Sequence, residues 1–111
     1  TPTGTGSVCL ATAAYVASTI SVNGAASTAA SLIICNKGSA LAVSLADGTT
    51  DGEFKIFTNK GAGAATITPD NFANGTSFTL SQNKATQCIW DGSNWFMLNG
   101  ADSASTGISI T

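Results

Sequence analysis

The residues best suited to chemistry are three carboxylates that lie close together in the segment DGTTDGE. Asp47, Asp51 and Glu53 offer the oxygen ligands that a hard cation such as Ca²⁺ prefers. Their spacing is not that of a known calcium loop, however. The favoured interpretation is therefore a solvated turn between a strand that ends at Ala46 and a strand that begins at Glu53.

Other catalytic groups are scarce. Histidine is absent, and acid–base or nucleophilic catalysis needs a base such as His or Lys beside the reacting group. The segment NKGAGAA, residues 59–65, is rich in glycine, but it lacks the Gly-Lys-Ser/Thr ending of a phosphate-binding loop, and a flexible hairpin connection is the better interpretation. We therefore expect no enzyme, no cofactor and no metal.

The three cysteines, Cys9, Cys35 and Cys88, are widely spaced and contain no Cys-x-x-Cys pair. The favoured interpretation is three small buried hydrophobic residues in a protein that folds in a reducing cytoplasm. One disulfide with a free thiol is the alternative. A zinc site is not expected, because tetrahedral sites need four Cys or His ligands.

The composition limits the partners. Charged residues make up 9% of the 111 residues, where about 25% is usual, and the net charge is -2. Arginine is absent and the four lysines are scattered, so nucleic acid is not an expected partner. Neither a membrane span nor a secretion signal is visible. Such a charge-poor surface indicates a chain that is covered by copies of itself or by a larger surface.

The two tryptophans flank a single tight turn in IWDGSNWFML, residues 89–98. A two-residue loop at Gly92-Ser93 makes the flanking strands antiparallel and places Trp90 opposite Trp95. A slightly longer loop that starts at Asp91-Gly92 is the alternative. In the two-residue case, the tryptophans form a non-hydrogen-bonded pair, in which side chains approach most closely.

The aromatic residues have two interpretations. The favoured one is a hydrophobic core, with one face of the tryptophan hairpin packed inside, because a small β domain needs most of its large side chains for burial. The rival is a carbohydrate-stacking platform, in which sugar rings lie on exposed aromatic residues beside Asn and Asp. Trp90 and Trp95 are then either hairpin core or ligand platform.

The elements that position these residues are strands. LAVSLADG alternates Leu41, Val43 and Leu45 with smaller residues, whereas residues 53–58 (EFKIFT) place apolar side chains on both faces. We count about nine or ten short strands at intervals of roughly ten residues. This pattern predicts an all-β fold: one domain over residues 1–111, an antiparallel β-sandwich or a jelly-roll or barrel-like domain, without a convincing internal repeat.

From Leu45 to Gly100 the chain resembles structural proteins of tailed bacteriophages, chiefly capsid decoration (cement) proteins, head fibres and distal domains of tail fibres. The resemblance rests on a strand ending in DG, then GEFKIF, a lysine-glycine turn, TITP, an F-NGT-FTL strand and the closing WDGSNWFML hairpin. It implies an all-β virion domain that is a homotrimer. These motifs are architectural, so the resemblance supplies no catalytic residue.

The expected function is that of a decoration protein on the outer surface of a phage head. The chain is then made in the bacterial cytoplasm and binds the major capsid protein. An extended N-terminal arm, residues 1–10, is expected to contact the shell or a neighbouring subunit through Pro2, Val8 and Leu10. The alternative is a receptor- or glycan-binding domain of a head spike or tail fibre.

Overall fold

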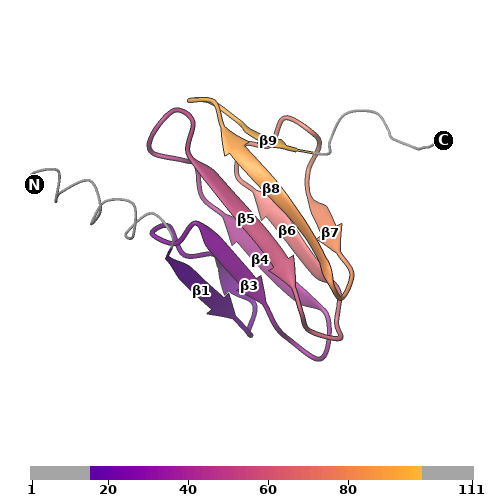
Figure 1. Ribbon diagram of the computed structural model, residues 1–111. Coiled ribbons are helices and arrows are strands. Elements are labelled where there is room, and N and C mark those ends of the chain that lie inside the picture. The colour runs from indigo at the N-terminus through magenta and orange to yellow at the C-terminus, as the bar shows by residue number, and fades with distance from the viewer. Residues whose placement is uncertain (1–15, 99–111) are drawn as a thin grey trace, which may run out of the picture.

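The computed structural model describes residues 16–98, which form nine strands and no helix (Figure 1). Sheet I has the strand order β1 (Ala17–Ile20), β3 (Leu32–Cys35), β5 (Phe54–Asn59), β8 (Lys84–Trp90) and β9 (Trp95–Met97). Sheet II has the order β2 (Gly24–Ala25), β4 (Leu41–Leu45), β6 (Ala65–Pro69) and β7 (Phe78–Leu80). In this range, no helix has the length and apolar character needed to span a membrane.

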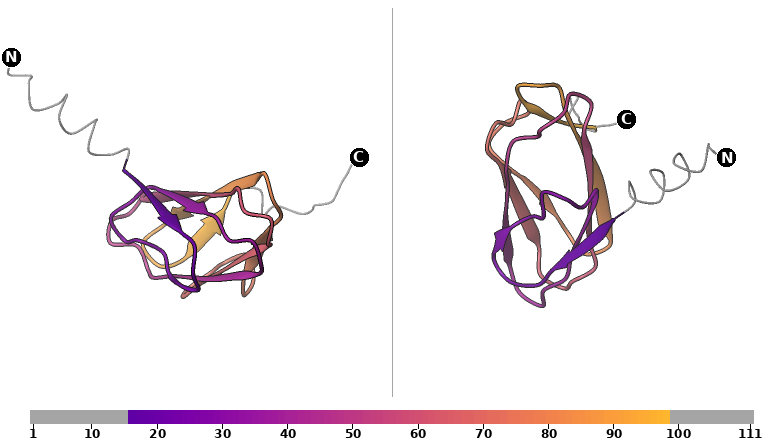
Figure 2. Two further views of the ribbon diagram at one scale, coloured as in Figure 1. Left: turned by 90° about the horizontal axis from the view of Figure 1, so that it is seen from below. Right: turned by 90° about the vertical axis from the view of Figure 1, so that its left-hand side faces the viewer.

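The chain alternates between the two sheets for its first six strands. Each odd-numbered strand joins sheet I and the next strand joins sheet II, so three successive windings lie side by side. Neighbouring strands from successive windings are parallel, as in the pairs β3–β5 and β4–β6. The last three strands are antiparallel to their neighbours and close the fold. Figure 2 shows the two layers from two further sides.

The all-β expectation and the count of nine or ten strands are confirmed for the described residues. The expectation of purely antiparallel sheets, and with it the jelly-roll arrangement, is wrong, because four of the seven strand pairs are parallel. The physical reason is the alternation between sheets. A strand that returns to its own sheet only after crossing to the other one arrives in the same direction as before.

The glycine-rich segment 59–65 is not the hairpin connection that the sequence predicts. It carries the chain from β5 across to β6, and it stacks on the corresponding turn of the preceding winding. Gly63 N–H donates to Lys37 O at 3.0 Å, and Lys60 N–H donates to Cys35 O at 2.9 Å. A Cβ on Gly63 would lie 1.8 Å from Ser39 O, so only glycine fits this backbone contact.

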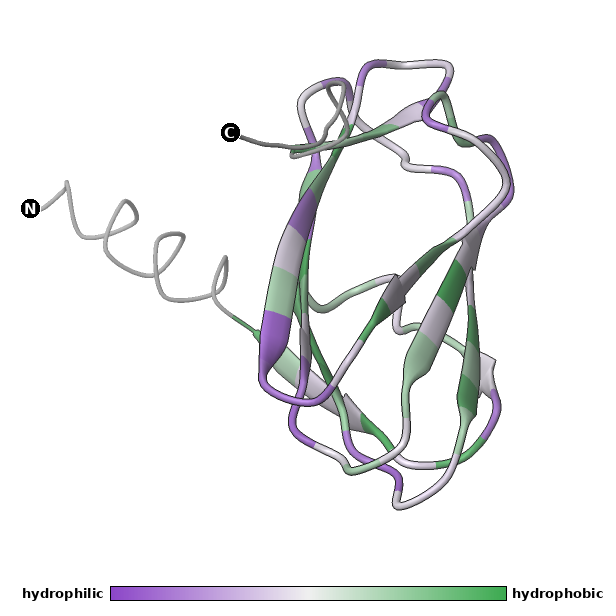
Figure 3. Cartoon of the chain, turned by 90° about the vertical axis from the view of Figure 1, so that its right-hand side faces the viewer, coloured by the Kyte–Doolittle hydropathy of each residue, from purple (hydrophilic) through white to green (hydrophobic). Residues whose placement is uncertain are grey.

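The core lies between the two sheets and is built from alternating strand positions. Figure 3 shows the changes of hydropathy along the strands. Leu41, Val43 and Leu45 are all buried, which confirms the predicted alternation of β4. In β5 the buried side chains are Lys55, Phe57 and Asn59. Phe57 meets Phe78 of the opposite sheet edge to face, with ring centroids 5.8 Å apart.

Candidate functional site

The tryptophan hairpin has the predicted two-residue loop and register. Trp90 pairs with Trp95, their ring centroids are 5.4 Å apart, and Asp91 N–H donates to Asn94 O. Gly92 has a φ of 102°, the left-handed conformation that glycine adopts at low cost. Both tryptophans belong to the hydrophobic core, and Trp95 is fully buried. The core interpretation is confirmed, and neither tryptophan is exposed as a platform for a sugar ring.

The loop that follows β4 covers the tryptophan pair. Trp95 Nε1–H donates to Ala46 O at 2.9 Å, and a Cβ on Gly48 would lie 2.4 Å from the Trp90 ring. Gly52 N–H also donates to Trp90 O at 2.7 Å. The loop at residues 47–48 thus covers the end of the core. Its backbone can approach the Trp90 indole closely because Gly48 has no side chain.

Two of the three carboxylates in residues 47–53 accept hydrogen bonds from different groups. Asp47 accepts both hydrogen bonds of the Asn71 amide group, and Glu53 Oε1 accepts the Thr49 N–H at 2.7 Å. Asp51 lies beside Gly92 of the hairpin. In the part of the chain that the structure describes, no three Asp, Glu, His or Cys side chains are arranged to hold a metal ion. The segment is a structured turn that packs against the hairpin.

Asp91 holds the hairpin loop through its carboxylate. Its Oδ1 accepts the N–H groups of Ser93 at 2.9 Å and Asn94 at 2.8 Å. These hydrogen bonds stabilise the ionised form and therefore lower the pKa of Asp91, with the Asn94 bond as the largest cause. The arrangement is an Asx turn, which favours the tight loop without any ligand.

Lys55 is an unexpected member of the core, because it is only 3% exposed. Its Nζ donates to Ala30 O at 2.5 Å and to Thr28 O at 3.3 Å. Desolvation lowers the pKa of this ammonium group, while the nearby Glu53 carboxylate acts in the opposite direction. Sequence reasoning had no signal for its burial, because Lys55 and Phe57 occupy the same face of a strand whose other face is also apolar.

Cys35 and Cys88 are free thiols without exposed surface, as the favoured interpretation predicts for these two residues. Burial raises the pKa of both, and that of Cys88 rises to about 12. They are therefore poor nucleophiles at neutral pH. Cys9 lies outside the described residues.

The outward face of sheet I carries many large apolar side chains, together with the polar residues Thr19, Thr58 and Gln87. Residues at alternate positions of neighbouring strands form continuous rows, such as Phe54, Ile89 and Phe96 across β5, β8 and β9. Several of these side chains are well exposed, among them Phe96 at 43% and Leu98 at 59%. We call this surface the apolar face of sheet I, and it consists of Leu32, Ile34, Phe54, Ile56, Ile89, Phe96 and Leu98.

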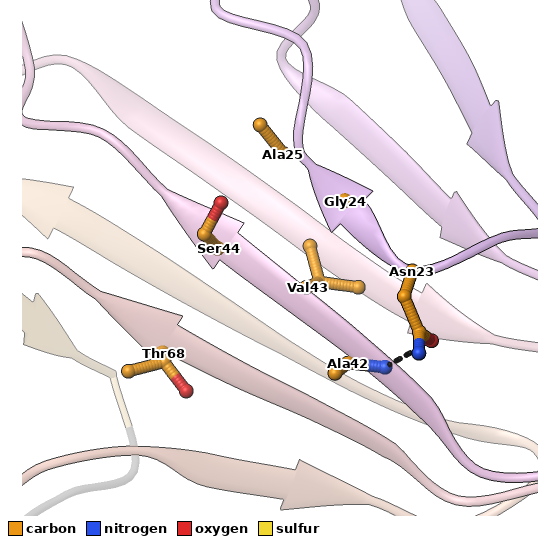
Figure 4. A pocket seen from close by; sticks show the side chains of 7 residues that line it. All are labelled: Asn23, Gly24, Ala25, Ala42, Val43, Ser44 and Thr68. Atoms are coloured by element: carbon orange, nitrogen blue, oxygen red, sulfur yellow. Dashed lines mark hydrogen bonds between the residues drawn. The ribbon is translucent and has the colours of Figure 1, made fainter.

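The outward face of sheet II differs sharply, because its strand positions carry small or hydroxyl side chains. These are Ala42, Ser44, Thr66, Thr68 and Thr79. A shallow hollow of about 440 Å³ lies over β4 and β6 beside the short strand β2 (Figure 4). At its rim the Ala42 N–H donates to Asn23 Oδ1 at 2.9 Å, so a side chain supplies the acceptor beside this strand.

A second hollow, of about 500 Å³, is more polar. It lies beside the tryptophan hairpin, and its lining includes Asp70, Asn71, Thr76 and Asn94 together with the half-buried ring of Phe72. The segment around Phe72 is tied to β9, since Trp95 N–H donates to Asn71 O and Ala73 N–H donates to Trp95 O. Sequence reasoning missed this hollow because it forms only where the segment of residues 68–76 meets Asn94 of the distant hairpin loop.

The arm residues Pro2, Val8 and Leu10 lie outside the described residues, so their expected contact stays a prediction. Comparisons with family models, with curated proteins and with solved structures find no match to this chain. The resemblance of residues 45–100 to phage structural proteins also stays a prediction. The observed site consists of two contrasting sheet faces and a polar hollow at the hairpin end of the fold.

Proposed function

We propose that the chain is a capsid decoration (cement) protein of a tailed bacteriophage. In this role it binds the major capsid protein on the outer surface of the head as a homotrimer, after synthesis in the host cytoplasm. It acts by mass action, because a protein that binds only the assembled shell stabilises that shell by its own binding free energy. The proposed role involves no catalysis, cofactor, nucleic acid or membrane.

One observation supports this proposal above the others: no outward-facing strand position of either sheet carries a charge. Within residues 16–98, the charged side chains lie in turns, at the first residue of β8 or, for Lys55, inside the core. Broad uncharged β faces suit permanent contacts that rest on shape and apolar burial. The proposed arm would add contacts through Pro2, Val8 and Leu10.

The test of this function is the copy number of the chain in purified virions, measured by quantitative mass spectrometry against the most abundant shell protein. A ratio near that of the shell protein is expected. A ratio of a few hundredths would indicate a fibre or spike instead, and absence from virions would refute the virion role altogether.

The arm is tested separately by a variant that lacks residues 1–8. We expect this variant to keep its fold but to occupy fewer sites on particles that lack the protein. A matched control replaces the same eight residues with a Gly/Ser segment of equal length. Undiminished occupancy of the deletion variant would show that the arm makes no contact with the shell.

The second candidate is glycan or receptor binding by a head spike or fibre domain, and the polar hollow beside the hairpin favours it. Asp70 and Asn94 provide hydrogen-bonding groups there, and Phe72 provides an aromatic edge. Glycan-array binding that disappears in Asp70→Asn, but persists in Asp51→Asn outside the hollow, would support this function. Binding lost with Phe96→Ala instead would place the ligand on the apolar face of sheet I.

A further inference from the structure

The apolar face of sheet I extends across four strands and is interrupted by Gln87, which pairs with Ile56. Phe54 pairs with Ile89, and Ile89 pairs with Phe96, so three large side chains form one row across three adjacent strands. The next row along the strands contains Leu32 and Ile56, which are also direct partners. Phe54 is 38% exposed and Ile89 is 37% exposed, values that are high for paired apolar residues in the middle of a sheet.

The opposite face of the molecule shows that this pattern does not follow from composition alone. Equivalent outward positions of sheet II carry residues such as Ser44, Thr66 and Thr68, which water solvates well. The same chain therefore places its large apolar side chains on both faces of sheet I but on only the inner face of sheet II. An exposed apolar surface of this kind marks an interaction site more often than a free surface.

We propose that the apolar face of sheet I is the surface through which copies of this chain associate with one another. The face carries no charge, so a second copy covers it without desolvating an ion. The net charge of -2 gives little repulsion between copies. Two such sheet faces can pack about 10 Å apart, with their strands inclined by about 30°.

The size of the face fits a reversible association. The face covers four strands, β3, β5, β8 and β9, which at about 4.8 Å spacing span roughly 19 Å, and its outward residues extend roughly 17 Å along the strands. Two such faces bury roughly 800 Å² in total once side-chain relief is included, which is below the size of a stable specific interface and suits a weak contact. We therefore expect self-association that depends on protein concentration. This face-to-face pair is a two-fold contact and is therefore separate from the contacts of the proposed homotrimer. The copy number in virions tests the shell-binding role, whereas the purified chain tests this inference.

The experiment measures the molar mass of the purified full chain by sedimentation velocity and light scattering over a wide range of concentration. The disrupting variant is Phe96→Glu, and the matched control is Thr68→Glu, which places the same charge at an exposed strand position of sheet II. Wild type and Thr68→Glu should self-associate alike. Phe96→Glu should raise the dissociation constant roughly a hundredfold, because a carboxylate is then buried without a partner.

A second variant, Gln87→Glu, guards against misfolding, because it adds a charge to the same face at a position that is already polar. Near-UV circular dichroism of the tryptophan pair reports whether each variant is folded. Three results would overturn the proposal. These are a monomeric wild type at every concentration, undiminished association of both folded sheet I variants, and equal dissociation by Thr68→Glu. The first would also result if residues outside 16–98 cover the face.

Discussion

At the scale of single residues, the tryptophan hairpin is held from three sides. The turn fixes its register, the Trp95 indole N–H bonds to Ala46 O in the loop after a sheet II strand, and Gly48 lies against the Trp90 ring. A side chain enclosed in this way stabilises the fold because its apolar surface is buried, and its truncation would leave a cavity. The pair therefore serves the core and not a ligand.

The first prediction concerns Trp90→Ala. Because Trp90 is 5% exposed, its removal should leave a cavity and lower the free energy of unfolding by about 3–5 kcal/mol. Urea denaturation followed by far-UV circular dichroism measures this change. The control is Val22→Ala, since Val22 is 71% exposed and its truncation should change stability by less than about 0.5 kcal/mol. A loss below about 1 kcal/mol for Trp90→Ala would contradict its burial.

The second prediction concerns Asp91 and acid. Its pKa in the folded state is lowered from the ordinary value of 3.8, so folding favours the ionised carboxylate. The resulting stability is complete above pH 3.8 and is lost as the pH falls through the lowered pKa. Asp91→Asn should therefore be less stable at neutral pH and should lack this part of the acid dependence. Urea midpoints between neutral pH and acid test it, and parallel curves for both proteins would refute it.

At the scale of elements, the stacked turns between the sheets explain the glycine-rich segment. Gly61 and Gly63 lie against the backbone of residues 37–39 in the preceding winding, where a Cβ would meet main-chain atoms. Backbone atoms cannot move aside as the end of a flexible side chain can. The contact therefore requires glycine for space, although neither residue is among those with a positive φ.

The third prediction compares two alanine substitutions in these turns. Gly63→Ala should lower the free energy of unfolding by about 1–3 kcal/mol, because the added methyl group must displace the Ser39 backbone. Gly38→Ala is the matched control, since nothing lies within 4 Å of its Cβ position. Thermal and urea denaturation of both variants test the difference. Equal stability of the two variants would show that the turns are not tightly stacked.

The same scale shows what could be predicted from the sequence. The hairpin was predictable because the turn residues and both tryptophans are local, and the alternation of Leu41, Val43 and Leu45 identified one buried face directly. The parallel order of the strands was not predictable from the sequence. Leu32 pairs with Ile56, and a strand of the other sheet lies between these two residues in the sequence. Local periodicity contains no information about such a crossing.

The candidate surfaces were less predictable than the strands. Both faces of residues 54–57 carry large apolar side chains, and the inner face also carries Lys55. Which face lies inside depends on distant groups, including the two carbonyls that accept hydrogen bonds from Lys55. The polar hollow likewise depends on a distant contact, because residues 68–76 form it together with Asn94. Only the general expectation of a charge-poor contact surface was available from the sequence.

At the scale of the whole molecule, the winding order determines how the chain must fold. The central pairs β3–β5 and β4–β6 join segments that are distant in the sequence, so their loops must close before the sheets gain stability. Within residues 16–98, β8–β9 is the only pair of adjacent strands joined by a tight turn. The molecule therefore depends on non-local pairing in both layers.

The fourth prediction follows from that order. The chain should fold with a time constant of milliseconds to seconds, as all-β domains with non-local pairing do. Stopped-flow tryptophan fluorescence measures this rate because both tryptophans become buried. Refolding under reducing conditions should be equally fast, since Cys35 and Cys88 are free thiols in the native state. Complete folding within microseconds would contradict the observed topology.

The windings also have a consequence for how such a chain can change in length. Leu32 is aligned with Ile56 in sheet I and Leu41 with Ala65 in sheet II, so both layers advance by the same 24 residues between the second and third windings. A duplication of that length that includes residues 59–63 would keep the alternation of inward residues and would again place glycine against the preceding turn. A segment of 24 residues is therefore a structural unit of this domain, and one duplication of it would add a further winding to both sheets around the same type of core.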